Sequence, residues 1–179
     1  MIQPAQILKK YFGYDSFREG QELLIQGILE GKDVLGIMPT GAGKSVCYQI
    51  PALMLPGITV VISPLISLMK DQVRALNEAG VHAAYINSSL TESQISKALY
   101  NARCGQYKIM YVAPERLESS LFRDFAMHTD ISMITVDEAH CISQWGQDFR
   151  PSYLNILNLI HALPRRPVIS AFTATATTK

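Results

Sequence analysis

The stretch Val34-Leu-Gly-Ile-Met-Pro-Thr-Gly-Ala-Gly-Lys-Ser45 decides the fold, because a short apolar run leads directly into a glycine-rich turn. The residues that follow, from Val46 to Leu53, have a helical pattern. A strand, a loop ending in Gly-Lys-Ser and a helix form the context in which such a loop binds phosphate. The stretch therefore predicts a site for a nucleoside phosphate at the carboxyl end of a buried strand.

The small residues of this loop suit close contact with phosphate. The predicted contacts come from Thr40, Gly41, Ala42 and Gly43. The two glycines allow torsions that point successive backbone N–H groups inward at phosphate oxygens. The helix that follows adds its unpaired N–H groups and the positive end of its dipole.

The next two residues supply a charge and a metal ligand. Lys44 is expected to contact the β and γ phosphates of the nucleotide, and the Ser45 hydroxyl is expected to bind Mg²⁺. The strict motif has Gly at position 38, where this chain has Met38. The alternative is an ordinary glycine-rich turn with an exposed lysine, which leaves the Lys-Ser pair at the helix start unexplained.

Short apolar, β-branched runs alternate with helical patterns along the rest of the chain. The predicted strands are Val34–Met38, Thr59–Ile62, Ala83–Ile86, Lys108–Val112, Ile131–Val136 and Val168–Phe172. This alternation predicts an α/β fold with a mostly parallel sheet and helices on both faces. No repeat or linker interrupts it, so residues 1–179 are expected to form one domain.

Capping signals predict where two of the helices begin. Ser16–Glu19 has the pattern of a capping box, and Gly31 is the expected stop of that helix. Thr91–Gln94 is a second box, which opens a helix to about Ala102. The chain ends in Thr-Ala-Thr-Ala-Thr-Thr-Lys directly after its last predicted strand, so we expect it to be one lobe of a longer protein.

A group of titratable residues follows the apolar run Ile131–Val136. It consists of Asp137, Glu138 and His140. Two adjacent carboxylates are electrostatically costly unless a cation lies beside them. Asp137 is expected to hold Mg²⁺ through its water shell, Glu138 to orient and deprotonate the attacking water, and His140 to link the site to neighbouring segments. An ordinary solvated acidic turn is the alternative.

The composition indicates a packed globular protein without strong overall charge. Of the 179 residues, 48% are hydrophobic and 17% charged, and the formal net charge is +1. Contact with nucleic acid must therefore be local. The three cysteines have no metal-binding spacing and are expected as free thiols in a reducing cytoplasm. No apolar run approaches the ~20 residues of a membrane helix, so we expect a cytoplasmic protein without a membrane partner.

Three motifs in this order resemble those of superfamily 2 helicases. They are the phosphate loop with Pro-Thr-Gly, Asp137-Glu-Ala-His140, and the small polar run Ser170–Thr177. The resemblance implies a RecA-like P-loop NTPase fold with ATP and Mg²⁺ as cofactors. Ser170–Thr177 resembles the third motif of these enzymes, which relays the nucleotide state to the nucleic acid.

Four further stretches resemble the RecQ family of DNA helicases. Phe12–Gln21 is similar to its adenine-recognition motif, and Ser63–Gln72 and Ala113–Leu117 are similar to its DNA-contacting segments. His140–Pro151 resembles its aromatic-rich loop. The resemblance implies ATP-dependent DNA unwinding of 3′-to-5′ polarity, in recombination and repair, with single-stranded or duplex DNA as the partner.

The residue types in Phe12–Gln21 fit recognition of adenine. Tyr14 and Arg18 are suited to hold a purine by stacking and cation–π contact. The Gln21 amide has a donor and an acceptor, which match the edge of adenine and mismatch guanine. For Phe17 we favour a packing role against the capped helix.

The aromatic-rich loop offers local contacts to DNA. Trp145 and Phe149 have stacking surfaces, and Arg150 is suited to a phosphate or a base. Stacking is worth roughly 1–3 kcal/mol per base, so a few such contacts matter despite the low net charge. The alternative is that both aromatic residues belong to the core. In RecQ-like enzymes this loop couples DNA contact to hydrolysis, and here it directly follows Glu138.

Hydrolysis at such a loop usually needs an arginine finger, worth roughly 10³–10⁵ in rate. In helicases of this kind a second RecA-like lobe supplies it. We therefore expect the chain to bind nucleotide, to hydrolyse it poorly and not to unwind DNA. An RNA helicase and a non-catalytic nucleotide-gated clamp remain as alternatives, although a clamp has no need of Lys44, Asp137 and Glu138 together.

Overall fold

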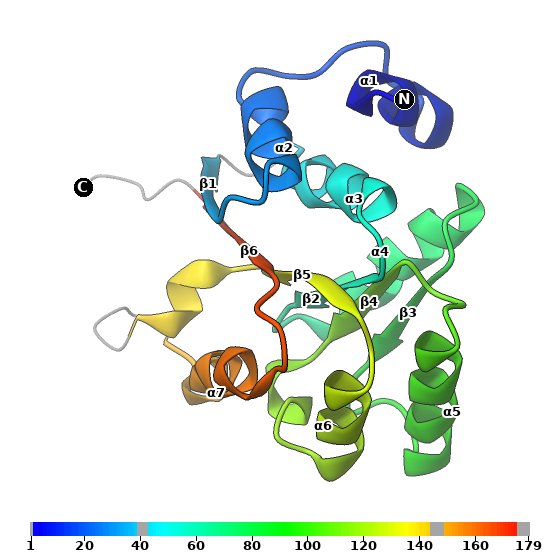
Figure 1. Ribbon diagram of the computed structural model, residues 1–179, viewed down its shortest axis with the longest axis vertical. Helices are drawn as coiled ribbons and strands as arrows, with labels where there is room; N and C mark the ends of the chain where they lie inside the picture. Colours follow the sequence, from blue (N-terminus) through cyan, green and yellow to red (C-terminus); the bar gives the residue numbers. More distant parts are fainter. Residues whose placement is uncertain (1, 39–42, 144–148, 175–179) are drawn as a thin grey trace.

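The computed structural model describes residues 2–38, 43–143 and 149–174 (Figure 1). Within these residues, six strands form one sheet in the order β1-β6-β5-β2-β4-β3, and every pairing is parallel. The strands are β1 Val34–Met38, β2 Ile58–Ile62, β3 Ala83–Ile86, β4 Ile109–Val112, β5 Ile131–Val136 and β6 Val168–Ala174. The predicted parallel α/β fold is confirmed.

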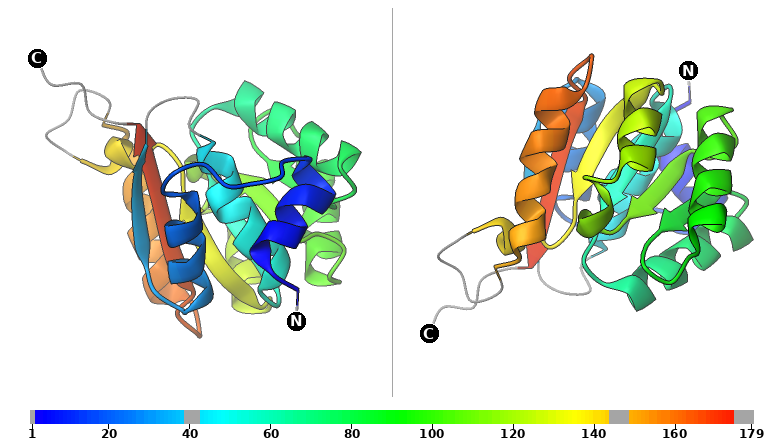
Figure 2. Two further views of the ribbon diagram at one scale, coloured as in Figure 1. Left: turned by 90° about the horizontal axis from the view of Figure 1, so that it is seen from above. Right: turned by 90° about the horizontal axis from the view of Figure 1, so that it is seen from below.

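The helices cover both faces of the sheet. Their bounds are α1 Pro4–Ile7, η1 Leu8–Phe12, α2 Gln21–Leu29, α3 Lys44–Met54, α4 Ile66–Glu78, α5 Glu92–Arg103, η2 Pro114–Arg116, α6 Ser120–Met127, η3 Ala139–Ile142, η4 Pro151–Leu154 and α7 Asn155–Ala162. Helices α1 to α4 lie on one face and α5, α6 and α7 on the other (Figures 1 and 2). None of the helices described is long and apolar enough to cross a membrane.

The central strand β2 shows why the predicted strands are apolar throughout. Val60 and Ile62 pack in the core beneath α5, α6 and α7, whereas Val61 packs in the core beneath α3 and α4. All three side chains are fully buried. A strand covered on both faces has no polar side, so it reads as a continuous apolar run.

The two predicted capping boxes have different outcomes. Thr91 caps α5, because its side chain accepts a hydrogen bond from the Gln94 N–H and the Gln94 side chain accepts one from the Thr91 N–H. The box at Ser16–Glu19 is wrong, since α2 begins only at Gln21, after Gly20 in a left-handed conformation. The physical reason is a competing contact: the Gln21 side chain accepts the Arg18 N–H and so sets a later start.

Candidate active site

The topology brings two separate segments of the chain to one edge of the sheet. Strands β1 and β5 both pair with β6 in parallel, so their carboxyl ends point the same way. The phosphate loop follows β1 at Met38, and the acidic pair Asp137–Glu138 follows β5 at Val136. In open parallel sheets, ligands bind outside this carboxyl edge.

Lys44 lies between the two carboxylates of the acidic pair. Its Nζ atom is 3.0 Å from Asp137 Oδ1 and 2.9 Å from Glu138 Oε1. Burial alone lowers the pKa of Lys44, but the two carboxylates more than offset this and raise it above its usual value. The cation that two adjacent carboxylates require is therefore the ammonium group of the phosphate loop itself.

The backbone holds the acidic pair in a defined geometry. The Asp137 N–H donates to the Ile62 carbonyl at 2.9 Å, and the Tyr153 hydroxyl donates to the Asp137 carbonyl at 2.7 Å. Glu138 has φ 55° and ψ 49°, a left-handed conformation that no other non-glycine residue among those described adopts. Such a conformation costs of order 1–3 kcal/mol and persists only where the surroundings enforce it.

His140 connects the acidic pair to the neighbouring strand. Its Nδ1 atom is 2.8 Å from the Thr173 hydroxyl, and its Nε2 atom is 3.7 Å from Glu138 Oε2. Thr173 belongs to β6, in the run that resembles the third helicase motif. A side chain on β6 therefore reaches the carboxylate of Glu138 through a single imidazole ring.

The donor set fits a magnesium ion. Ser45 directly follows Lys44 in the first turn of α3, and Lys44 contacts the carboxylate of Asp137. Hydroxyl and carboxylate oxygens are hard ligands of the kind that Mg²⁺ prefers, and its remaining ligands are commonly water and substrate phosphates. Ser45 and Asp137 are the residues that would hold the ion.

The three predicted adenine contacts lie around one small pocket beside the phosphate loop. The pocket has a volume of about 80 Å³ and is lined by Leu8, Tyr14, Ser16, Arg18, Gln21, Gly43 and Val46. Gln21 is buried, and its Nε2 atom donates to the Gly43 carbonyl at 2.9 Å. Gln21 thus lines this pocket and also contacts Gly43, the residue directly before Lys44.

A second pocket adjoins the acidic pair. It has a volume of about 530 Å³ and is lined by Pro64, Leu65, Glu138, His140, Cys141, Phe149 and Arg150. Two of the predicted DNA contacts, Phe149 and Arg150, therefore share a pocket with Glu138. Thr40, Gly41 and Ala42 of the phosphate loop and Trp145 of the aromatic-rich loop lie outside the described residues.

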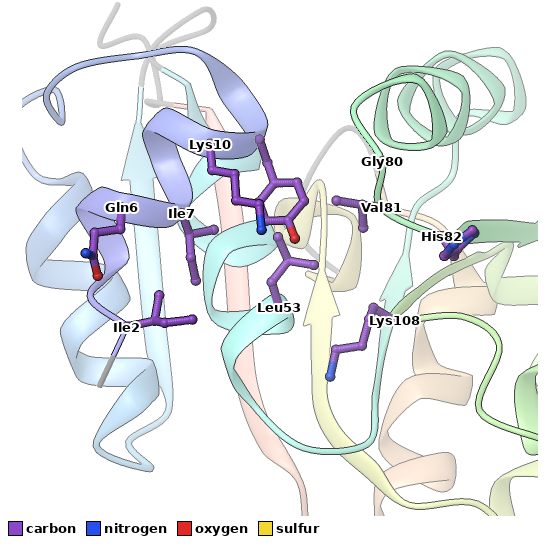
Figure 3. A pocket seen from close by; sticks show the side chains of 10 residues that line it. Ile2, Gln6, Ile7, Lys10, Leu53, Gly80, Val81, His82 and Lys108 are labelled. Carbon is purple, nitrogen blue, oxygen red and sulfur yellow. The ribbon is translucent and has the colours of Figure 1, made fainter.

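A mainly apolar pocket lies near the amino ends of β3 and β4, away from the carboxyl edge that carries the acidic pair (Figure 3). It has a volume of about 470 Å³ and is lined by Ile2, Gln6, Ile7, Lys10, Tyr11, Leu53, Gly80, Val81, His82 and Lys108. Burial lowers the pKa of Lys108, whose Nζ atom donates to the Leu55 carbonyl at 2.7 Å. None of the predicted site residues lines this pocket.

Two polar residues of the site were not predicted from the sequence. Tyr153 holds the Asp137 carbonyl, and Gln72 donates from Nε2 to the Ser45 hydroxyl at 3.2 Å. Both contacts join segments that are distant in the chain. Nothing in the sequence around a tyrosine or a glutamine indicates which distant residue its side chain will contact. The resemblance implies a role for Gln72 only as part of Ser63–Gln72, in contact with DNA.

Comparison with known proteins agrees with this geometry. Residues 18–179 match the DEAD/DEAH box helicase family. The ATP-dependent DNA helicase RecQ of Bacillus subtilis is 55% identical over 99% of this chain, and that of Haemophilus influenzae is 49% identical over 95%. The chain spans only 30% and 27% of the lengths of these two relatives.

Solved structures show the same fold at low sequence identity. A hypothetical ATP-dependent RNA helicase from Sulfolobus tokodaii has a TM-score of 0.74 at 21% identity, covering 98% of this chain and 51% of that one. The DUF1998 helicase MrfA bound to DNA and AMPPNP has a TM-score of 0.78 at 18% identity, covering 99% of this chain and 27% of that one. The predicted RecA-like fold is confirmed.

Replacing Lys44 with Met is expected to lower the free energy of unfolding by about 1–3 kcal/mol without nucleotide, because two carboxylates lose their cation. This is less than for a fully buried pair, since the Lys44 and Glu138 side chains stay 26% and 24% exposed. Urea unfolding at neutral pH measures the change. The control is Lys32→Met in an exposed pair with Glu30, which should leave the free energy of unfolding nearly unchanged. Equal losses in the two variants would contradict the role of Lys44.

The stabilisation by Lys44 should also depend on pH in one direction. The pKa of Lys44 is raised in the folded chain. The stabilisation is therefore complete below the unfolded value of about 10.4 and is lost as the pH rises through the higher folded value. The difference between the unmodified chain and Lys44→Met should thus stay constant from neutral pH to about pH 9.

Proposed function

We propose that this chain, which belongs to the DEAD/DEAH box helicase family, is the ATP-binding motor lobe of a RecQ-type DNA helicase. The observation that carries the proposal is the position of Lys44, held by Asp137 and Glu138 at the carboxyl edge of the sheet. An ammonium group that already contacts both acids needs only a small movement to reach a phosphate bound at the same loop. Residues 1–179 form one RecA-like lobe in this proposal.

The residues of the site have distinct roles in ATP hydrolysis. Lys44 would exchange the carboxylates for the β and γ phosphates of the substrate, and Asp137 and Ser45 would hold Mg²⁺. Bound Mg²⁺ supplies neutralisation of the phosphate charge. Glu138 orients the attacking water and accepts its proton. The contact of Glu138 with Lys44 supports this role, because it holds the carboxylate beside the lysine that is proposed to bind the phosphates.

The nucleotide base is held beside Gln21. In this proposal Tyr14 and Arg18 stack on adenine, and the Gln21 amide reads its edge. Their shared pocket next to Gly43 supports the assignment. Because Gln21 also bonds the Gly43 carbonyl, occupation of the base pocket and the shape of the phosphate loop are linked.

The DNA contacts come from the aromatic-rich loop and from Ser63–Gln72. Phe149 and Arg150 share a pocket with Glu138 and His140, which supports coupling between the DNA-binding loop and hydrolysis. We assign Trp145 to the same loop. His140 and its contact with Thr173 relay the nucleotide state to β6.

The whole protein acts in DNA recombination and repair, unwinding DNA with 3′-to-5′ polarity. A second RecA-like lobe completes the site by adding an arginine finger. The three cysteines are free thiols, which is common in a reducing compartment and supports action in the cytoplasm.

The protein with its second lobe is expected to hydrolyse ATP faster when single-stranded DNA is added. The variant Glu138→Gln should lose at least about 10²-fold in hydrolysis rate while still binding nucleotide, because only the base for the attacking water is removed. Steady-state hydrolysis with matched DNA and RNA strands measures both. Stimulation by RNA alone would favour an RNA helicase. Unchanged hydrolysis in Glu138→Gln would refute the catalytic role.

The chain alone is expected to be stabilised by Mg²⁺ with ADP more than with GDP. A ligand at one hundred times its dissociation constant adds ~2.7 kcal/mol, which for this size is roughly 5–10 °C in thermal midpoint. Gln21→Ala should abolish the preference for adenine, and Gln26→Ala, at an exposed position of the same helix, should keep it. A preference that survives in Gln21→Ala would show that another group reads the base.

A further inference from the structure

A chain of hydrogen bonds joins Ser45 to the interior of the protein. Gln72 donates from Nε2 to the Ser45 oxygen at 3.2 Å. Gln49 donates from its own Nε2 to Gln72 Oε1 and to the Tyr111 hydroxyl, both at 3.0 Å. The Tyr111 and Tyr48 hydroxyl oxygens are 2.7 Å apart. Tyr48 in turn forms a side-chain hydrogen bond with Ser45. The predicted metal ligand is therefore a member of a continuous polar network.

The direction of these hydrogen bonds constrains the Ser45 hydroxyl. A glutamine amide has an acceptor at one end and donors at the other. Because Gln49 occupies the oxygen of Gln72, the amino group of Gln72 points at Ser45. The Ser45 oxygen has two lone pairs, and Gln72 engages one of them. Tyr48 also forms a side-chain hydrogen bond with the Ser45 hydroxyl. The contacts with Gln72 and Tyr48 together restrict the direction of the other lone pair, with which the oxygen would bind a metal.

The inner part of the network is rigid. Gln49, Tyr48 and Tyr111 are 3%, 2% and 1% exposed. Burial raises the pKa of both tyrosines well above the usual value, so their hydroxyls stay neutral at physiological pH. Hydrogen bonds at low dielectric are strong, and a satisfied buried network holds its members in one arrangement.

The network also connects Ser45 to the segment assigned to DNA contact. Gln72 lies on α4, which begins at Ile66 directly after Pro64 and Leu65. These two residues line the pocket that contains Phe149 and Arg150. Helix α4 thus connects the two places: its start adjoins that pocket, and its residue Gln72 contacts the Ser45 hydroxyl.

We propose that Gln72 is a positioning residue for magnesium, which holds the Ser45 oxygen in the orientation that the metal requires. The inference rests on the proposed function, because it takes Ser45 as a ligand of the nucleotide-bound Mg²⁺. Outer-shell hydrogen bonds orient metal ligands, and their loss typically costs about 10–100-fold in metal affinity. Ser45 shares the ion with phosphate oxygens and water, so the lower end of this range applies here.

The test compares Gln72→Met, which keeps the length of the side chain and removes its hydrogen bonds, with Arg74→Met. Arg74 lies on the same helix and pairs only weakly with Asp71 at the surface. Binding of a fluorescent ADP analogue to the chain is titrated with Mg²⁺, starting from EDTA. Thermal midpoints confirm that both variants are folded.

The Mg²⁺ concentration for half-maximal binding should rise about tenfold in Gln72→Met, whereas nucleotide affinity in EDTA should stay within about twofold. Arg74→Met should change neither quantity. Gln49→Met should produce a smaller rise, since it leaves the contact of Gln72 with Ser45 in place and removes the hydrogen bonds to the Gln72 amide oxygen and the Tyr111 hydroxyl.

An unchanged Mg²⁺ requirement in folded Gln72→Met would overturn the inference. An equal loss of affinity in EDTA would also overturn it, because it would show a general disturbance of the phosphate loop. Failure of the unmodified chain to bind the analogue at any Mg²⁺ concentration would overturn the proposed function, and the inference with it.

Discussion

The contact of Lys44 with Asp137 and Glu138 is the interaction on which the rest of the site depends. Two adjacent carboxylates at a partly buried sheet edge require a cation, and the chain supplies one from a segment more than ninety residues earlier. In the proposed function, the same contact also keeps the lysine close to the phosphates that it would bind. The contact of Lys44 with the two acids therefore balances their charge and, in the proposed function, also positions the lysine for nucleotide binding.

The register of the sheet makes this arrangement possible. Met38 pairs with Ala174 at the end of β6, and Val136 pairs with Ile62 at the end of β2. Strands β2 and β5 are buried along nearly their whole length, whereas the edge strand β1 buries Gly36 and Met38 and exposes Leu35 and Ile37. A one-residue shift of any of these strands would move its buried residues to the wrong face. The core thereby sets the distance between Lys44 and the acids. Around them, Gln21, Gln72 and His140 connect the site to separate parts of the fold.

The sheet could be predicted from the sequence because each buried strand is a continuous apolar run, and three of the six had the observed bounds. That Lys44 and the acidic pair lie at one edge of the sheet could be predicted, because each follows a strand of the same parallel sheet. Their roles toward phosphate and metal stay predictions. The start of α2 was wrong because Gln21 bonds the Arg18 backbone instead of leaving the cap to Ser16. The partner of Gln72 could not be predicted, since a side-chain contact between distant segments leaves no periodic pattern.

A crystal structure of the chain with Mg²⁺ and a non-hydrolysable ATP analogue tests the central claim most directly. The quantity to measure is the separation of Lys44 Nζ from Asp137 Oδ1, which is 3.0 Å in the present structure. We predict that Lys44 leaves Asp137 for the β and γ phosphates, with the metal beside Ser45 and Asp137. A nucleotide bound elsewhere, or a Lys44 still held between both carboxylates beside a bound nucleotide, would contradict the account.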